Sequence, residues 1–314
     1  MTSGNADVGG LLVPLVMPMR PDGCLDPDSY ARHARRVLDA GARGFWVNGS
    51  SGDFHAIGED DSIETVVIAR AVAGPDVPII AHVGDTATDR SVRKARRSMD
   101  AGADHVAAIT PYYADYTHEE LVSHHARIAE ASGRSVFLYQ HPATGKAPLP
   151  VGTIIGMVKD GVCGGIKESG VDIDYFEELV TCAREHDCGL RTFHGAGGRA
   201  LETLGMGSSG IITVLANLLP GTCASLYRCV VEDDLEQARR HQDRVDELAR
   251  ALAASMPTRS TAAPAVAAIK YVLSELGIHQ HDLVMDPLRP LDELERSALR
   301  QQVLPMAAEE LTGN

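Results

Sequence analysis

The chain has 314 residues, of which 44% are hydrophobic and 23% are charged, and its formal net charge at pH 7 is −14. This composition excludes wholesale disorder, and the length allows one large α/β barrel or two smaller domains. Binding to nucleic acid would need a basic surface, so the acidic balance argues against such a partner.

We predict no targeting signal and no membrane segment from the sequence. The apolar run at 11–19 is too short and too broken by proline to cross a bilayer, and no basic residue precedes it as in a signal peptide. The six cysteines form no Cys-x-x-Cys pair. We therefore expect free thiols and a cytoplasmic protein without a membrane partner.

Short apolar runs alternate with amphipathic segments along most of the chain. We predict strands at 11–16, 44–48, 78–83, 105–109, 136–139, 163–167, 190–194 and 210–214. Helices are expected at 26–40, 59–73, 88–101, 117–132, 151–158, 172–186 and 198–204. Eight βα steps of this kind predict a (β/α)8 TIM barrel. An internal echo supports this prediction, because Asp39-Ala-Gly-Ala42 and Asp100-Ala-Gly-Ala103 each end a helix just before a strand.

The pattern changes to helix only after Pro220. Helical periodicity continues at 232–254, 262–276 and 291–308. We predict a catalytic barrel domain at 1–230 and a C-terminal helical domain at 231–314. The helical domain would cover one flank of the barrel or build an oligomer contact.

One lysine stands at the end of a predicted strand, in Cys163-Gly-Gly-Ile-Lys-Glu-Ser-Gly170. Alternation along the strand places Cys163, Gly165 and Lys167 on one face, and Gly165 would leave room under the ammonium group. Burial in a barrel mouth would lower the pKa of Lys167 and make it a candidate Schiff-base nucleophile. A surface lysine that follows a strand is the alternative interpretation.

Other polar residues cluster at the predicted carboxyl ends of strands, where barrel enzymes build their active sites. Ser50 and Ser51 lie between glycines, so their N–H groups and hydroxyls could form a nest for a carboxylate, although an ordinary turn has the same pattern. Tyr112, Tyr113 and Tyr139 could relay protons or simply pack at the rim.

These motifs together resemble the family of dihydrodipicolinate synthase and N-acetylneuraminate lyase. The matching motifs are Gly-Ser-Ser-Gly-Asp at 49–53, Thr-Pro-Tyr-Tyr at 110–113, Leu-Tyr-x-x-Pro at 138–142 and Gly-Ile-Lys-Glu-Ser at 165–169. The likeness runs from about Val13 to at least Asn217. It implies a class I aldolase on a (β/α)8 barrel with a C-terminal helical extension.

The resemblance also implies residue roles. Lys167 would form the Schiff base with a pyruvate-type 2-oxo acid, and Tyr139 would act as general acid and base at its carbonyl. Ser50 would pass protons between Tyr139 and Tyr113, and the latter would reach into a neighbouring subunit, so a homodimer or homotetramer is expected. The expected substrate-binding residues are Ser50, Ser51, Gly52, Asp53, His141, Thr144, His194 and Ile212.

No cofactor beyond the covalent imine is expected. The spacing of His82, His141 and His194 matches no metal motif, so we predict no metal site. These histidines fall near strand ends, where each would contact a polar substrate tail or simply lie at a wet rim.

The sequence departs from the synthase pattern at the position that selects the second substrate. An arginine of the synthase follows its proline by two residues and meets a second carboxylate, whereas here Thr144 follows Pro142. We therefore expect a lyase or aldolase that acts on a 2-oxo acid and a neutral aldehyde, and not a true dihydrodipicolinate synthase.

Three alternatives stay open. The same imine would serve a dehydratase of 2-keto-3-deoxy sugar acids. Gly195-Ala-Gly-Gly198 after the seventh strand could instead bind a phosphate, which would indicate a phosphosugar enzyme. A catalytically silent barrel that serves as a ligand sensor or scaffold is the third alternative.

Overall fold

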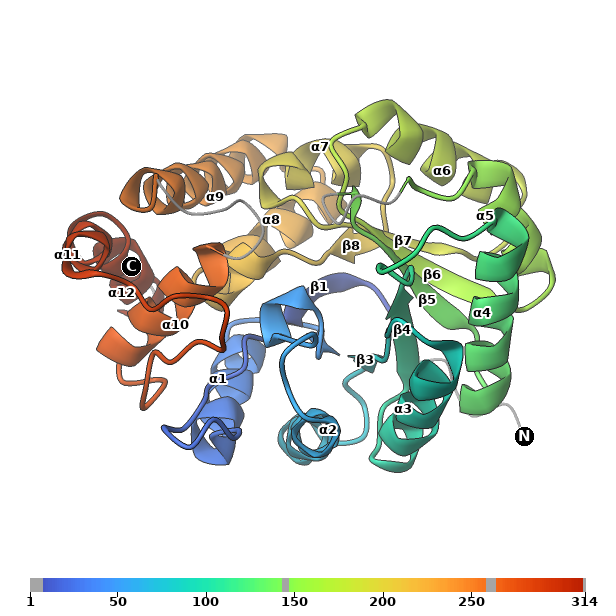
Figure 1. Ribbon diagram of the computed structural model, residues 1–314. Helices are drawn as coiled ribbons and strands as arrows, with labels where there is room; N and C mark the ends of the chain where they lie inside the picture. Colours follow the sequence, from blue (N-terminus) through green and yellow to red (C-terminus); the bar gives the residue numbers. More distant parts are fainter. Residues whose placement is uncertain (1–7, 143–146, 258–263, 313–314) are drawn as a thin grey trace.

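The computed structural model describes residues 8–142, 147–257 and 264–312, which contain a closed barrel of eight parallel strands (Figure 1). The strands follow one another around the barrel in chain order, and β8 pairs with β1 to close it. The predicted (β/α)8 fold is therefore confirmed. The strands are β1 (Gly10–Pro14), β2 (Gly44–Val47), β3 (Ile79–His82), β4 (His105–Ile109), β5 (Val136–Gln140), β6 (Cys163–Glu168), β7 (Arg191–His194) and β8 (Gly210–Ile211).

Helices cover the outside of the barrel and begin and end at local signals in the sequence. The Asp26 side chain accepts a hydrogen bond from the Ser29 N–H at the start of α1. Gly41 and Gly102, the two glycines of the internal echo, have φ angles of 102° and 106°, which only glycine adopts without strain. The barrel helices are α1 (Pro27–Asp39), α2 (Glu59–Ala73), α3 (Thr88–Asp100), α4 (His118–Ser132), α5 (Val151–Lys159), α6 (Ile173–Glu185), α7 (Ala200–Gly205) and α8 (Pro220–Val231).

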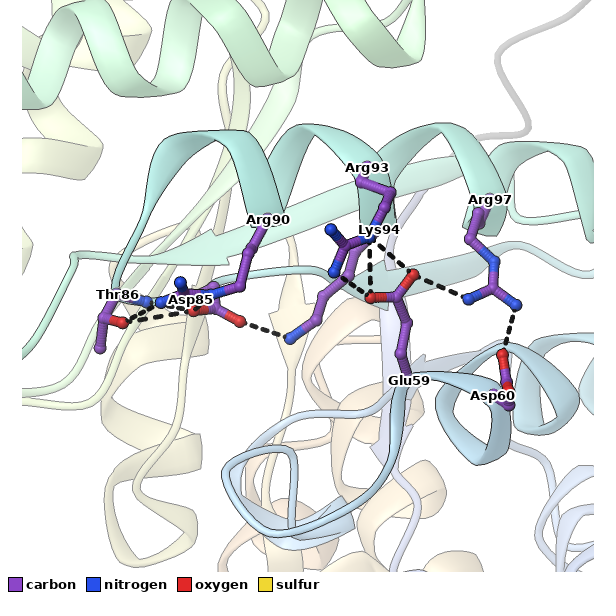
Figure 2. A network of polar contacts seen from close by, with 8 residues as sticks. All are labelled: Glu59, Asp60, Asp85, Thr86, Arg90, Arg93, Lys94 and Arg97. Carbon is purple, nitrogen blue, oxygen red and sulfur yellow. Dashed lines mark hydrogen bonds and ion pairs between the residues drawn. The ribbon is translucent and has the colours of Figure 1, made fainter.

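Ion pairs join α2 to the side of α3 that faces it (Figure 2). Glu59, at the first position of α2, accepts from Arg93 at 2.6 Å and from Arg97 at 2.7 Å. These two guanidinium groups lower the pKa of the Glu59 carboxyl from 4.5 to about 2, against the opposing effect of burial. Asp85, in the loop between β3 and α3, pairs with Lys94 at 2.7 Å, so ion pairs hold α3 both to α2 and to the loop that precedes it.

The C-terminal helices gather at one side of the barrel, beside α1 and α8 (Figure 1). They are α9 (Leu235–Ser255), α10 (Pro264–Glu275), α11 (Glu293–Gln302) and α12 (Leu304–Thr312). Helix α9 packs on α8 and on α11, and α10 contacts the 3-10 helix η4 (Val214–Asn217) that follows β8. No helix in the described part of the chain combines the length and apolar composition that a membrane crossing needs.

Two predicted elements differ from the structure. The strand predicted at 210–214 ends at Ile211, because the Thr213 side chain accepts from the Leu215 N–H and starts η4 instead. The helix predicted at 291–308 is two helices, α11 and α12, and Pro305 lies in the first turn of the second one.

The barrel interior is a packed core below a polar rim. Its inward side chains come from alternate positions of the strands, as the pleat requires. They include Leu12, Trp46, Ile80, Ala107, Ile109, Phe137, Tyr139, Phe193 and Ile212, all of them buried. The side chains that carry the chemistry therefore sit on this core at the carboxyl ends of the strands.

Candidate active site

Lys167 lies on the inner face of β6, between Tyr139 of β5 and Phe193 of β7 in the register of the sheet. The residue is only 6% exposed. Its Nζ lies 4.5 Å from the centre of the Tyr139 ring and 5.3 Å from that of Trp46. No carboxylate among the described residues forms an ion pair with it, so burial lowers the pKa of Lys167 from 10.5 to about 7. A substantial fraction of this amine is therefore neutral at pH 7.

The strand that carries Lys167 has a bulge that the predicted strand did not include. Val136 pairs with Cys163 but the next residue, Phe137, pairs with Gly165, so Gly164 is an extra residue in β6. Cys163 consequently packs with Ile166 in the cluster between the strands and helices α5 and α6, and the prediction that it shares a face with Lys167 is wrong.

The role given to Gly165 also changes. A Cβ atom at this position would lie 2.2 Å from Cε1 of Phe137. The glycine therefore makes room for the Phe137 ring inside the barrel, and not directly for the lysine ammonium.

The hydroxyl of Tyr139 pairs with that of Ser50, and the two could relay a proton. Its Oη lies 3.2 Å from Oγ of Ser50, within hydrogen-bond distance. Burial raises the pKa of the Tyr139 phenol to about 12, although hydrogen bonds from Ser50 and Ser169 oppose this effect. The phenol therefore holds its proton at neutral pH.

Ser169 is a site residue that the sequence reasoning missed. A Cβ on Gly195 would lie 2.1 Å from Ser169 Oγ and 3.3 Å from Cε of Lys167, so Ser169 and Lys167 share one corner of the site with Gly195. The signal was present, because Ser169 follows Lys167 by two positions and alternation would place both on one face.

The Gly-Ser-Ser-Gly motif forms a single turn, the 3-10 helix η1 (Ser50–Gly52). The N–H of Gly52 donates to Gly49 O at 2.9 Å, and that of Asp53 donates to Ser50 O at 3.3 Å. No acceptor within the described ranges takes the N–H groups of Ser50 or Ser51. Two donors thus remain available at the amino end of the turn, as a carboxylate nest requires.

Asp53 has a partner that the sequence did not indicate. Its carboxylate lies 2.5 Å from Nζ of Lys270, which α10 contributes from the C-terminal helices. Asp53 is 5% exposed and Lys270 is 0% exposed. The Asp53 carboxylate therefore forms an ion pair with a buried lysine of the C-terminal helices.

The remaining predicted residues are distributed unevenly around the site. The His141 ring lies 5.8 Å from that of Tyr139, and Ile212 packs in the barrel interior. Tyr113 is 88% exposed, and no hydrogen bond joins it to Ser50 in the described part of the chain. Thr144 lies outside the described residues.

His194 and His82 lie on opposite faces of the sheet. The His194 ring packs at 5.0 Å from that of Phe176 on α6, so it faces the helical layer and not the barrel interior. The His82 ring lies 5.9 Å from that of Tyr139, and its Nε2 accepts from the Ile109 N–H at 3.1 Å. Burial lowers the pKa of His82 to about 3, so this ring is neutral.

The glycine-rich loop after β7 is explained by packing. A Cβ on Gly197 would lie 2.8 Å from Oγ1 of Thr213, and one on Gly198 would lie 3.3 Å from a carboxylate oxygen of Asp246. A phosphate at this loop would meet that carboxylate, so the structure does not favour the phosphosugar alternative.

The structure is a closed (β/α)8 barrel. A buried lysine, a tyrosine–serine pair and open N–H donors lie at the carboxyl ends of its strands, where enzymes with this fold have their active sites. The chain belongs to the dihydrodipicolinate synthetase family, which matches residues 7–305. The family named from the four motifs is thereby confirmed.

Relatives under several names match more than nine tenths of this chain. It is 31% identical over 292 residues to an uncharacterised DapA-like lyase of Halobacterium salinarum, covering 92% of this chain and 91% of the relative. It is also 31% identical over 296 residues to the 4-hydroxy-tetrahydrodipicolinate synthase of Salinibacter ruber, covering 94% and 93%. The crystal structure of YagE from E. coli, a prophage protein solved with pyruvate, has a TM-score of 0.87 at 21% identity. The match covers 95% of this chain and 98% of YagE. The last likeness concerns the fold alone.

Proposed function

We propose that this protein is a lyase or aldolase that forms or cleaves a carbon–carbon bond of a 2-oxo acid through an imine at Lys167. The observation that supports this most strongly is the lysine itself, which is buried, has no ion-pair partner among the described residues and has a pKa of about 7. A lysine with these properties presents a neutral amine at physiological pH.

The chemistry follows from the groups around that amine. The Lys167 nitrogen adds to the C2 carbonyl of the 2-oxo acid, and loss of water gives the protonated imine. In the cleavage direction a base takes the proton of the C4 hydroxyl, the C3–C4 bond breaks, its electron pair moves into the imine to give an enamine, and an aldehyde leaves. Protonation at C3 and addition of water then release pyruvate and restore the amine. The imine supplies the electron sink, so this reaction calls for no other cofactor.

Proton transfer is assigned to Tyr139 and Ser50. The phenol is protonated at neutral pH because its pKa is about 12, so it first acts as an acid toward the departing water. Ser50, 3.2 Å away, would accept or return the proton. We propose that the exposed Tyr113 completes this relay in a neighbouring subunit of a homodimer or homotetramer.

The second substrate is proposed to be a neutral or hydroxylated aldehyde. The acidic aldehyde of the synthase reaction needs a cation, and an arginine pairs best with a carboxylate. Arg199, the first arginine after β7, is already paired with Glu202 at 2.9 Å. His141 beside Tyr139 instead suits a hydroxyl group.

The deciding experiment is borohydride reduction of the protein with pyruvate, followed by intact mass and peptide mapping. We expect one reduced adduct, located on Lys167 and absent from a Lys167→Ala variant. An adduct on Lys159 or Lys270 would overturn the assignment, and no adduct at all would favour the sensor or scaffold alternative.

Substrate class is tested in parallel. Pyruvate is assayed with aspartate semialdehyde and with neutral sugar-like and aromatic aldehydes, and 2-keto-3-deoxy sugar acids are assayed for loss of water. We expect a neutral aldehyde to give the highest kcat/KM. If the semialdehyde does so, the exclusion of synthase activity fails, and if water loss is fastest, the protein is a dehydratase that uses the same imine.

A further inference from the structure

We propose that Lys270 of the C-terminal helices is a positioning residue that acts through Asp53 to set the carboxylate-binding turn at Ser50 and Ser51. The inference rests on the proposed function, because it concerns how the same site holds the carboxylate of a 2-oxo acid. It gives the helical extension a part in binding in addition to covering a flank of the barrel.

The contact between the two residues is direct and closed to water. Lys270 Nζ lies 2.5 Å from the carboxylate of Asp53, from which it is separated by 217 residues in the chain. The side chains are 0% and 7% exposed. Among the residues that the structure describes, Asp53 is the one carboxylate within ion-pair distance of Lys270. Each charge is therefore held in place by the other.

The surroundings of Lys270 make Asp53 its necessary partner. His279 follows the end of α10 by four residues and is 2% exposed. Its pKa is lowered by burial and by four nearby groups, which are His33, Lys270, Arg32 and Arg36. Lys270 therefore shares this side of the site with two arginines, while the imidazoles of His33 and His279 are neutral. The Asp53 carboxylate is held firmly because it is paired with a fully buried cation.

Asp53 transmits that hold to the turn through its backbone. Its φ angle is 54°, in the left-handed region where a residue with a side chain needs support from its surroundings. Its N–H donates to Ser50 O, and its carbonyl accepts from Ala56 at 2.8 Å and from Ile57 at 3.1 Å. The same residue thus links the turn that carries the open donors to the segment that follows. If the carboxylate lost its anchor, this backbone conformation and the direction of the two N–H groups would relax.

The experiment compares variants of the full chain by the pyruvate concentration that gives half-maximal borohydride trapping at Lys167. The central variant is the double change Asp53→Asn with Lys270→Met, which removes both charges and keeps the approximate volumes. The single Lys270→Met and the charge-preserving Asp53→Glu and Lys270→Arg are made beside it. Thermal unfolding of each variant separates a loss of stability from a change in the site.

The matched control is the double change Arg70→Met with Asp104→Asn. That ion pair joins α2 to the start of β4, at the end of the barrel away from the site. Its removal should lower stability without changing the half-maximal pyruvate concentration by more than about two-fold.

We expect the central variant to fold and to reach nearly the wild-type extent of trapping at saturation, with a half-maximal pyruvate concentration raised about 10-fold or more. A purely structural pair would leave this concentration unchanged in the folded double variant, and that result overturns the proposal. If the double variant does not fold, Asp53→Glu and Lys270→Arg decide, since shifting the pair by about one bond should also raise the concentration, and no rise in either overturns the proposal. Failure of the wild type to trap pyruvate would instead refute the proposed function, and the positioning role with it.

Discussion

The buried amine of Lys167 should make the stability of the protein depend on pH in a defined direction. The pKa is about 7 in the folded chain and 10.5 in the unfolded one, so between these values the unfolded chain binds more protons and stability rises with pH. Keeping the lysine buried costs about 5 kcal/mol below pH 7, about 4 at pH 7 and about 2 at pH 9. Replacement by Met removes this cost while retaining a side chain of similar length.

We therefore expect Lys167→Met to be more stable than wild type at pH 6, with an advantage that shrinks by about 2 kcal/mol between pH 7 and pH 9. Urea unfolding at several pH values measures the difference. Lys159→Met is the control, because Lys159 is exposed at the end of α5 and its replacement should have an effect that does not vary with pH. A difference for Lys167→Met that stays flat from pH 6 to pH 9 would show that this lysine titrates normally and would remove the main support for the imine.

Three further outcomes are expected. Tyr139→Phe should lower kcat by about 10²-fold or more while leaving the half-saturating 2-oxo acid concentration nearly unchanged in steady-state assays, and a raised KM alone would make Tyr139 a binding residue. Mixed oligomers of Lys167→Ala and Tyr113→Phe chains should recover part of the activity, whereas no recovery in verified mixed oligomers would mean that each chain builds its own site. Glu59→Gln should reduce the free energy of unfolding at pH 7 by about 1 kcal/mol, because the arginines that it pairs with are partly exposed. Since the Glu59 pKa falls from 4.5 to about 2, this contribution is complete above pH 4.5 and is lost toward pH 2, so equal stabilities of the two proteins in urea at pH 7 would contradict it.

The order of elements could be predicted because each βα step carries its own local signals. Apolar runs mark the strands, and the stops at Gly41 and Gly102 mark where helices turn back to the barrel. Two further local signals mark element boundaries that differ from the predicted ones. Pro305 marks the start of a new helix, and Thr213 favours a cap over continuation of the last strand.

The face of a strand residue was harder to predict than the strand itself. Alternation assumes an unbroken register. The extra Gly164 breaks it, so the side chain before the bulge in β6 lies on the opposite face from the one predicted. Lys167 was placed correctly because it follows the bulge, while Cys163 was placed wrongly because it precedes it. Two consecutive glycines in a strand are the pattern that indicates such a bulge.

The partner of Asp53 could not be predicted from the motif in which Asp53 occurs. A carboxylate beside two serines and two glycines is typical of a binding loop, and nothing within the motif distinguishes a group that faces substrate from one that faces the protein.

The distinguishing signal lies in α10, where Lys270 stands between Ile269 and Tyr271 in a run of buried residues. A lysine in such a run must find a buried acceptor, because an isolated ammonium would lose its proton or destabilise the helix. A lone charge in an apolar helix is therefore evidence about a distant part of the chain, and in this protein it connects the C-terminal helices to the turn proposed to bind the substrate carboxylate.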